Sequence, residues 1–447
     1  MKKLSVFFLV VLLAACTASP ATRIPASPTG TPNLRATGTA QVYASWTEMV
    51  QTLTAQPLKS TPAPTEILSP TTTEMPAAAT LGPTPTSLPK LQPGQSLTLT
   101  NLHMIDAAIG WGIESSGHIL HTNDGGTTWL DVTPPKFVNN YIYGIFLDAQ
   151  TAWAEKCDQE TGKCNLLRTL DGGQTWTNQS NSLSFNASYV SIEFQNINDG
   201  WAETYDMGAG QGHTTIYETH DGGTTWNQVM LTNLKGIEGS LPGAIDTCNI
   251  CGDVFYYSSS RQIIISGDLS SNPGKAVHLS ISTNLGKTWK YLSLPLPADK
   301  FVDGLVAPLQ PTFFNDKDGV LPFQIIDQTF VDGVTAVYST QDGGQIWQAN
   351  TNVLENVSSI TFISSQDAFA VCGTSLCITH DGAHTWQTLT SNLNFGISDS
   401  REYVEQFSFI THSIGWALTV YNGLHALWKT TDGGLTWEEL KPVIVKP

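Results

Sequence analysis

Apolar and polar residues alternate in short stretches along most of the chain from about residue 95 to the C-terminus. The alternation is clear in Ser191-Ile-Glu-Phe194 and in Thr215-Ile-Tyr-Glu-Thr219. Its period of two is that of a half-buried β-strand. In this region no stretch has the apolar spacing of a helix of about ten residues or more. The pattern therefore predicts an all-β domain made of many short strands.

A phrase of the form Ser/Thr-x-Asp-x-Gly-x-x-Trp returns seven times, the fourth time with Asn in place of Asp. Its fullest copy is Thr122-Asn-Asp-Gly-Gly-Thr-Thr-Trp129, and successive copies end 39 to 63 residues apart. A period in this range indicates a repeat architecture. The copies end at Trp129, Trp176, Trp226, Trp289, Trp347, Trp386 and Trp437.

Each part of the phrase serves folding. The Asp carboxylate can accept hydrogen bonds from backbone N–H groups that follow it, as in an Asx turn. Glycine supplies the positive φ of a tight hairpin, and the Trp ring holds the outgoing strand against its neighbours. We therefore interpret the repeated polar residue as a turn-former. The seven positions are Asp124, Asp171, Asp221, Asn284, Asp342, Asp381 and Asp432.

A second regularity lies upstream of each phrase. Phe146, Phe194 and Phe409 each precede a tryptophan by seven residues. We therefore expect four strands in each unit: the first ends near the Phe, the second carries Gly-Trp-Ala, the third leads into the Asp turn and the fourth carries the final Trp. Seven units predict a single seven-bladed β-propeller of four-stranded antiparallel blades. The fourth unit is the most degenerate, and Ala383 replaces glycine in the sixth, where we expect a strained or altered turn.

The phrase, together with Gly-Trp-Ala upstream, resembles the Asp-box (BNR) repeat. That repeat occurs in bacterial sialidases, xyloglucan hydrolases, sortilin-type receptors and the photosystem II assembly/stability factor family, and the pairing with Gly-Trp-Ala is most similar to the last. The resemblance covers about residues 95–445 and implies the fold, but the superfamily includes enzymes and binding proteins alike. The photosystem factors resemble one another in an arginine-lined patch. This chain departs from that pattern, with only Arg168, Arg261 and Arg401 beyond the stalk.

The N-terminus predicts export. A basic start and an apolar stretch over residues 4–13 are typical of a signal peptide and are too short to span a bilayer. Leu13-Ala14-Ala15-Cys16 resembles the bacterial lipobox, whose cysteine is lipidated, so we expect Cys16 to anchor the chain on the extracytoplasmic side of a membrane. An uncleaved anchor or a plain secreted protein is the alternative. The predicted division is a signal peptide at 1–16, a Thr/Pro/Ala-rich disordered stalk at 17–93 and the propeller at 94–447.

The net charge excludes some classes of partner, and the cysteines indicate the redox environment. A formal net charge of −17 argues against nucleic acid and against anionic membrane surfaces as partners. Six cysteines follow Cys16, and in an exported chain disulfides are favoured. For the middle pair, half of a metal site or a redox motif are alternatives. The expected pairs are Cys157 with Cys164, Cys248 with Cys251, and Cys372 with Cys377.

The sequence contains no recognisable set of catalytic residues. Sialidases resemble one another in three arginines, a Tyr nucleophile polarised by a Glu, and an acidic residue. Those residue types occur in this chain at Arg168, Arg261 and the run Arg401-Glu402-Tyr403, but the spacing of these residues matches no sialidase pattern. A xyloglucanase-like mechanism needs two opposed carboxylates, and this chain has length for only one propeller. No metal-ligand spacing, nucleophile elbow or phosphate loop occurs. We therefore assign no catalytic residue, no metal and no cofactor.

Binding fits the sequence better. The links between units are long at 231–255 and 294–312, and such links emerge on one face of a propeller. Aromatic rings among amides suit a carbohydrate or a polypeptide, although Tyr141 and Tyr189 could instead fill the ring's interior. We predict a monomeric, lipid-anchored binding or assembly module for protein or glycan, with an exo-acting glycoside hydrolase of the sialidase type as the alternative. The candidate ligand-binding residues are Tyr141, Tyr189, Phe301, Asp303, Arg401, Glu402 and Tyr403.

Overall fold

The structure is a computed structural model of the whole chain. It describes residues 88, 90–135, 142–157, 163–184, 189–208, 211–231, 251–257, 262–267, 276–282, 290–295, 305–309, 311–326, 333–350, 352–355, 357–396 and 402–446. The predicted signal peptide, Cys16 and nearly all of the predicted stalk lie outside these residues. Within the described ranges, no helix has the length and apolar character that crossing a membrane requires.

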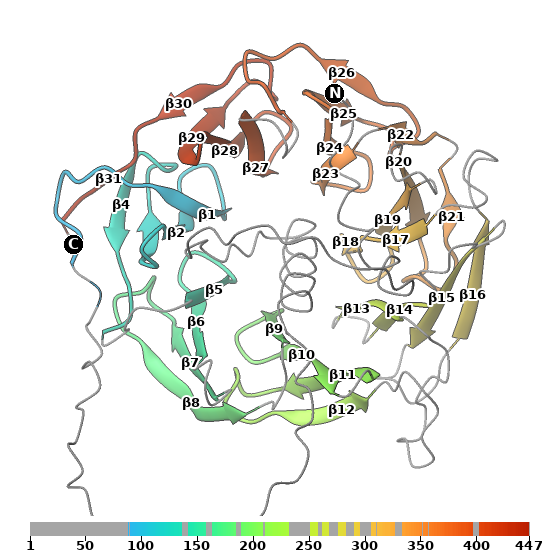
Figure 1. Cartoon of the computed structure of the whole chain (residues 1–447), viewed down its shortest axis with the longest axis horizontal. Coiled ribbons are helices and arrows are strands. Elements are labelled where there is room, and N and C mark those ends of the chain that lie inside the picture. The colour runs from blue at the N-terminus through green and yellow to red at the C-terminus, as the bar shows by residue number, and fades with distance from the viewer. Residues whose placement is uncertain are drawn as a thin grey trace, which may run out of the picture.

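The strands form sheets arranged around a central axis, one sheet for each repeat unit (Figure 1). Most consecutive strands of a unit are neighbours and run antiparallel, since short turns join them. The first three units contain β1 (Leu99–Met104), β2 (Gly110–Glu114), β3 (Ile119–Thr122) and β4 (Thr128–Asp131); β5 (Ile142–Phe146), β6 (Ala152–Cys157), β7 (Lys163–Thr169) and β8 (Thr177–Ser184); and β9 (Tyr189–Phe194), β10 (Gly200–Gly208), β11 (Gln211–Thr219) and β12 (Asn227–Leu231).

The remaining units follow the same order around the ring. Unit 4 contains β13 (Cys251–Tyr257), β14 (Gln262–Gly267), β15 (Ala276–Ser282) and β16 (Lys290–Pro295). Unit 5 contains β17 (Leu305–Pro308), β18 (Thr312–Phe313), β19 (Gly319–Ile326), β20 (Gly333–Thr340), β21 (Gln348–Ala349) and β22 (Leu354–Glu355). Units 6 and 7 contain β23 (Val357–Phe362), β24 (Ala368–Cys372), β25 (Ser375–Thr379) and β26 (Gln387–Leu389), then β27 (Glu402–Phe409), β28 (Gly415–Tyr421), β29 (Leu424–Thr430) and β30 (Glu438–Leu440).

The prediction of a single seven-bladed propeller of four-stranded antiparallel blades is wrong. The structure supports an all-β propeller of six blades, most of which have four antiparallel strands. Unit 1 gains a fifth, parallel strand, β31 (Val443–Ile444), and unit 5 has six strands. The backbone of the most degenerate unit, β13–β16, forms a further sheet, in which side chains are described on β16 alone.

Proline explains part of the irregularity in unit 5. Its inner edge is split into β17 and β18, and both of these strands pair with β19. Pro311 lies in the gap between them. Because proline has no N–H to donate, it interrupts a ladder of hydrogen bonds. The outer edge is split in the same way, with β21 and β22 both pairing with β20.

The core of the molecule lies between neighbouring sheets rather than in one central mass. Rings of one unit stack on the Phe of the next: Trp153 on Phe194 with ring centroids 3.7 Å apart, and Phe369 on Phe409 at 3.6 Å. Trp153 and Phe369 occupy the same repeat position and are almost fully buried. The seven-residue interval seen in the sequence is therefore an interval between two residues that each pack against a neighbouring unit.

Both ends of the described chain meet at unit 1 and close the ring. β31 pairs parallel with β4, and Val445 N–H donates to Trp129 O at 2.9 Å. The segment before β1 pairs with β31 from the other side, where Gly94 N–H donates to Ile444 O at 2.8 Å and Ile444 N–H to Gln95 O at 3.0 Å. The side chain of Ile444 is buried in the cluster between units 7 and 1.

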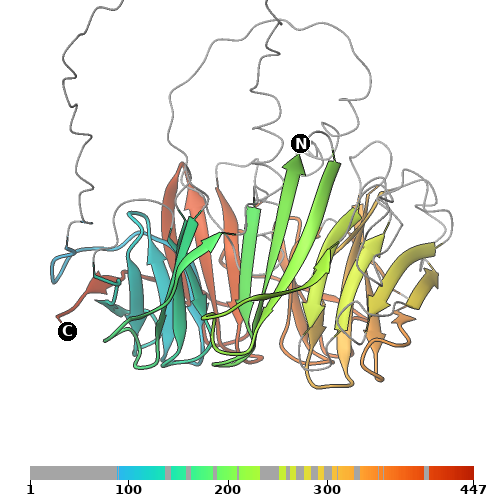
Figure 2. The same ribbon diagram turned by 90° about the horizontal axis from the view of Figure 1, so that it is seen from below.

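The two ends of the propeller differ. Since neighbouring strands alternate in direction, the turns after the first and third strands of each unit lie on one end, which we call the Asp-box end. The second and fourth strands of each unit end at the opposite end, where the described hairpin turns between second and third strands also lie (Figure 2).

Candidate functional site

The structure describes one side chain among the seven residues predicted to bind a ligand, that of Tyr403. Tyr189 and Glu402 begin β9 and β27, where the backbone is described. The others lie outside the described residues: Tyr141, Phe301, Asp303 and Arg401.

An exposed apolar pair lies at the tip of unit 7, on the end opposite the Asp boxes. The β28–β29 hairpin turns through Asn422 and Gly423, both with positive φ, as a two-residue hairpin turn requires. Tyr421 and Leu424 flank the turn and face each other in the register, so their side chains share one face of the hairpin. They are 54% and 72% exposed. Sequence reasoning missed this pair because a hairpin tip with one Tyr and one Leu carries no motif.

Tyr403 lies near the same tip but on the other face of the sheet. It pairs with Val420, which in turn pairs with His425, and directly opposed residues share a face. Burial, reinforced by the charge of Glu405, raises the pKa of the Tyr403 phenol. The Glu405 carboxylate also lies 3.1 Å from His425 Nε2. Tyr403 is thus a partly buried residue at the junction of units 7 and 1 rather than a freely presented ring.

A small cavity adjoins this junction. It measures about 150 Å³ and is lined by His425 and Leu427 of β29, by Leu97 and Leu99, and by Glu439 to Pro442 before β31. Pockets that enclose organic ligands usually measure roughly 300–1,000 Å³. This cavity has room for a few water molecules but not for a sugar chain.

The carboxylate of each described Asp box accepts hydrogen bonds from its own turn. Thr122 Oγ1 donates to Asp124 Oδ1 at 3.0 Å, and the N–H and the hydroxyl of Thr128 donate to the same carboxylate at 2.9 and 2.6 Å. Burial opposes ionisation of Asp124, but these hydrogen bonds outweigh it and lower its pKa. The same pattern recurs at Asp171, Asp221, Asp342, Asp381 and Asp432, where Ile346 takes the place of the last Thr in the Asp342 turn. The fourth copy, with Asn284 and Trp289, lies outside the described residues.

A second repeated turn accompanies each described Asp box and was not identified from the sequence. The residue two after the Phe position accepts two backbone N–H bonds, as when Asp106 Oδ1 accepts from Ala108 and Ile109 at 2.7 Å. The first glycine of the Asp box then donates its N–H to this turn, as Gly125 does to Ala108 O at 2.7 Å. The signal was available, because the capping positions align as Asp106, Asp148, Asn196, Asn315, Ser364 and Thr411.

The residue just before the Asp-box Thr joins neighbouring units. Arg168 Nη1 donates to Ile197 O of unit 3 at 2.9 Å, and Lys429 Nζ donates to Ala107 O of unit 1 at 3.4 Å. Arg168 is therefore used in a structural contact at the Asp-box end of unit 2, whereas Tyr403 lies near the opposite end of unit 7. The sialidase-type grouping of these two residues does not form. Arg261 and Arg401 lie outside the described residues.

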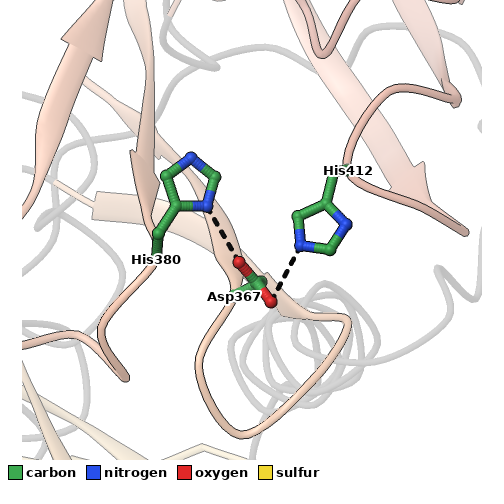
Figure 3. Close-up of side chains that lie close together, drawn as sticks. All are labelled: Asp367, His380 and His412. Atoms are coloured by element: carbon green, nitrogen blue, oxygen red, sulfur yellow. Dashed lines mark hydrogen bonds and ion pairs between the residues drawn. The ribbon is translucent and has the colours of Figure 1, made fainter.

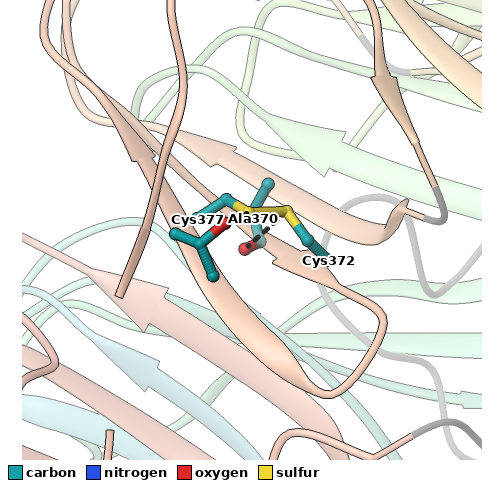
Figure 4. The surroundings of a disulfide bond; sticks show 4 residues. Ala370, Cys372 and Cys377 are labelled. Carbon is teal, nitrogen blue, oxygen red and sulfur yellow. Dashed lines mark hydrogen bonds between the residues drawn. A yellow bond between two sulfur atoms is a disulfide. The ribbon is translucent and has the colours of Figure 1, made fainter. Parts of the chain in front are cut away.

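One predicted cysteine pair forms a disulfide in the structure. Cys372 and Cys377 are bridged across the β24–β25 hairpin (Figure 4). Cys157 and Cys164 lie directly opposite each other in the register of β6 and β7, although their side chains lie outside the description. Cys248 is outside the described residues and Cys251 begins β13.

Side chains able to ligate a metal gather at the Asp-box end, between units 6 and 7. Asp367, His380 and His412 place one ligand atom each within 4.8 Å of the others (Figure 3). No metal-ligand spacing marks them in the sequence, because His412 comes from the next unit. This group is separate from the exposed pair of unit 7.

Comparisons with known proteins show similarity of fold. No family model and no curated protein matches the chain. Among solved structures, the chain is similar to YCF48 bound to D1 peptide, with 15% identity, a TM-score of 0.46, and coverage of 77% of this chain and 99% of that one. It is also similar to YCF48 from Cyanidioschyzon merolae, with 14% identity, a TM-score of 0.46 and coverage of 76% and 97%.

Glycosidase propellers are similar as well. An α-L-arabinanase from Penicillium chrysogenum has 14% identity and a TM-score of 0.37, with 68% of this chain and 94% of that one covered. At such identities the likeness concerns the fold alone, and propellers host both binding proteins and enzymes. The arrangement of its sheets makes the chain a β-propeller, and it has structural similarity to YCF48 and to glycosidase propellers.

Proposed function

We propose that this propeller is a non-catalytic binding module for a polypeptide segment, which it holds at the tip of unit 7 opposite the Asp boxes. The observation that carries the proposal is the pair Tyr421 and Leu424, both more than half exposed on one face of the β28–β29 hairpin. A Leu side chain left 72% exposed beside an exposed Tyr offers apolar area that a partner can cover.

A polypeptide suits this surface better than a glycan does. The adjoining cavity, at about 150 Å³, is too small to enclose a sugar chain, and a Leu side chain complements apolar side chains. The net charge of −17 favours a segment that carries Lys or Arg, because complementary charge speeds encounter. YCF48 has been seen with the D1 peptide, but that likeness is one of fold, and the proposal rests on the surface of unit 7.

The test is a binding measurement with defined ligands. The full chain is screened against an array of peptides that combine apolar residues with basic or acidic ones, and against a glycan array. We expect saturable binding to apolar–basic peptides and a loss of about tenfold or more in affinity for the double variant Tyr421→Ser/Leu424→Ser. Binding to glycans alone, or peptide binding that the double variant leaves intact, would contradict the proposal.

Matched controls separate the tip from general surface hydrophobicity. Ile346 and Leu435 are 61% and 49% exposed but lie in Asp-box turns, at the other end of the molecule. The double variant Ile346→Ser/Leu435→Ser should bind as the wild type does. Tyr403→Ala should have a smaller effect than the Tyr421/Leu424 variant, because Tyr403 faces the junction with unit 1.

We also propose that the module is displayed on the extracytoplasmic side of a bacterial membrane through lipidated Cys16. The lipobox-like Leu13-Ala14-Ala15-Cys16 and the Thr/Pro-rich stretch after it support this. Metabolic labelling with an alkyne-tagged fatty acid in a bacterial host tests it. The wild type should be labelled and sediment with membranes, while Cys16→Ser should be unlabelled. Equal labelling of the two chains would exclude Cys16 as the anchor.

A further inference from the structure

At the Asp-box end, between units 6 and 7, three side chains able to ligate a metal ion lie close together. Asp367 follows the second turn of unit 6, His380 lies just before Asp381 of the Asp box, and His412 comes from the second turn of unit 7. His380 Nδ1 lies 2.8 Å from Asp367 Oδ1, and His412 Nε2 lies 2.9 Å from Asp367 Oδ2. Figure 3 shows the carboxylate between the two imidazole rings.

We propose that Asp367, His380 and His412 form a binding site for one divalent transition-metal ion of the zinc–copper class, which links units 6 and 7. Two imidazole nitrogens with one carboxylate oxygen are a donor set that such ions prefer, whereas Mg²⁺ and Ca²⁺ prefer oxygen ligands. Three protein ligands leave a fourth position for water.

The two N···O separations need only small adjustment, whereas the two imidazole nitrogens, which lie within 4.8 Å of each other, would have to approach to about 3.3 Å. Ligand atoms around a tetrahedral zinc ion with bonds of about 2.0–2.1 Å lie roughly 3.3 Å apart. The present N···O separations of 2.8 and 2.9 Å would have to open by a few tenths of an ångström. Both His side chains are more than half exposed, at 59% and 63%, so their rings are able to turn. Each ring would carry its proton on its other nitrogen, which leaves a lone pair for the ion on the nitrogen next to Asp367.

The carboxylate is already held in place for this role. Ser364 Oγ lies 2.7 Å from Asp367 Oδ2, and Asp367 N–H donates to Ser364 Oγ at 2.9 Å. A carboxylate oriented by an outer hydrogen-bond partner is what metal sites usually provide.

The junction of units 6 and 7 differs from others in the described chain. At the junctions of units 2 with 3 and 7 with 1, a cation placed just before the Asp-box Thr reaches a carbonyl of the next unit. In unit 6 that position is Ile378, which has no polar group to donate. The contact from Asp367 to His412 spans this junction instead.

Unit 3 supplies a matched comparison. His220 and Asp199 occupy the repeat positions of His380 and Asp367, and His220 Nδ1 lies 2.7 Å from Asp199 Oδ1. His220 Nε2 also lies 3.3 Å from Glu218 Oε2, so Asp199, His220 and Glu218 together offer one imidazole and two carboxylates. A site that needs two imidazoles should therefore form in unit 6 and not in unit 3.

The test is a calorimetric titration of the full chain with ZnCl₂. The chain carries no polyhistidine tag, and the buffer contains no reductant. One ion should bind per chain. Affinity should fall at least tenfold in Asp367→Ala and in His412→Gln, while His220→Ala should bind as the wild type does. Gln keeps an N–H donor for Asp367, so His412→Gln should fold as the wild type without metal and lose the rise in melting temperature that zinc produces.

Copper provides a second, independent readout. Electron paramagnetic resonance of the chain with one equivalent of Cu²⁺ should show coupling to two imidazole nitrogens, reduced to one in His412→Gln. Zinc binding that survives His412→Gln, a copper spectrum that the substitution leaves unchanged, or no binding by the wild type would each overturn the proposal. In the last case the three side chains would form a metal-free hydrogen-bonded link between units.

Discussion

At the scale of single residues, the two positions after the Asp of the Asp box obey different constraints. The first is glycine in every described copy; in the copies ending at Trp129, Trp226, Trp386 and Trp437, an added Cβ would lie 2.7 to 2.9 Å from a backbone carbonyl of its own unit. The second faces side chains of a neighbouring unit, which can differ from copy to copy. This explains how Ala383, at φ +69°, is accepted at the second position. The strain expected at Ala383 from the sequence is present.

The first prediction compares these positions. Gly433 has φ +76°, and a Cβ there would lie 2.8 Å from His412 O. Gly433→Ala should therefore lower the free energy of unfolding by about 2 kcal/mol or more, from backbone strain and steric overlap. Ala383→Gly should change it by less than about 1 kcal/mol, since relief of strain offsets the lost buried methyl. Denaturant unfolding measures both. Equal effects would refute the distinction.

The second prediction concerns the charge of an Asp-box carboxylate. Hydrogen bonding from the Thr385 hydroxyl, above all, lowers the pKa of Asp381 from 3.8 to about 2. A depressed pKa in the folded state stabilises the fold above the unfolded value and loses that effect as the pH falls toward the folded value. Asp381→Asn should lower the melting temperature at neutral pH by a few degrees. The difference from the wild type should shrink between about pH 4 and pH 2. A difference that stays constant over this range would contradict the assignment.

At the scale of elements, the repeat unit is held by pairs of turns rather than by the Asp box alone. Gly433 N–H donates to Ser413 O at 2.9 Å, and Gly172 N–H donates to Gln150 O at 2.9 Å. The same bond recurs in each described unit that carries the Asp box. It fixes the distance between two hairpin ends that are about 20 residues apart in the chain. The unit therefore behaves as one module, as expected in repeat proteins.

The third prediction concerns the β24–β25 hairpin. The Cys372–Cys377 bridge closes a short loop, for which chain entropy predicts about 2 kcal/mol of stabilisation. The double variant Cys372→Ser/Cys377→Ser should lower the free energy of unfolding by about that amount. Ser375→Ala, in the same hairpin, keeps the bridge and should have little effect. Denaturant midpoints measured without reductant test the comparison, and equal midpoints for the three chains would show that the bridge contributes nothing.

At the scale of the whole molecule, closure joins residues from the two ends of the described chain. The side-chain amide of Gln406, in β27, bonds to both backbone groups of Leu102, accepting from its N–H at 3.0 Å and donating to its oxygen at 2.7 Å. Trp416 Nε1 donates to Gly125 O at 2.9 Å across the same junction. Together with β31, these contacts make unit 1 depend on residues more than 290 positions away.

The fourth prediction tests closure. Deleting residues 442–447 removes β31, the buried Ile444 and the backbone bonds to Trp129, Gln95 and Leu97. The deletion should lower the free energy of unfolding by about 5 kcal/mol or more. The backbone amides of β4 should also exchange with solvent earlier than in the wild type. Deleting residues 446–447 alone leaves β31 intact and should have little effect. If the longer deletion unfolds at the same temperature as the wild type, the terminal strand is not what closes the ring.

Part of the candidate site could be predicted from the sequence, and part could not. The capping residues of the second turn align at fixed offsets, so a closer reading of Asp106 and Asn196 would have found them. The exposed Tyr421–Leu424 pair could not be predicted from the sequence, because exposure depends on which hairpin ends remain uncovered after packing. The use of Arg168 as a link between units was likewise invisible, since its acceptor belongs to another unit.

The sequence by itself determined the all-β class, the repeat unit and the turn chemistry, since each depends on residues a few positions apart. An Asp bonding to the next residues, a glycine at positive φ and alternating strands are local features. The tertiary structure alone decided the strand count of each blade, the closure through β31 and the meeting of Asp367 with His412. These depend on how whole units pack and where the chain ends meet, and no spacing along the chain encodes such contacts.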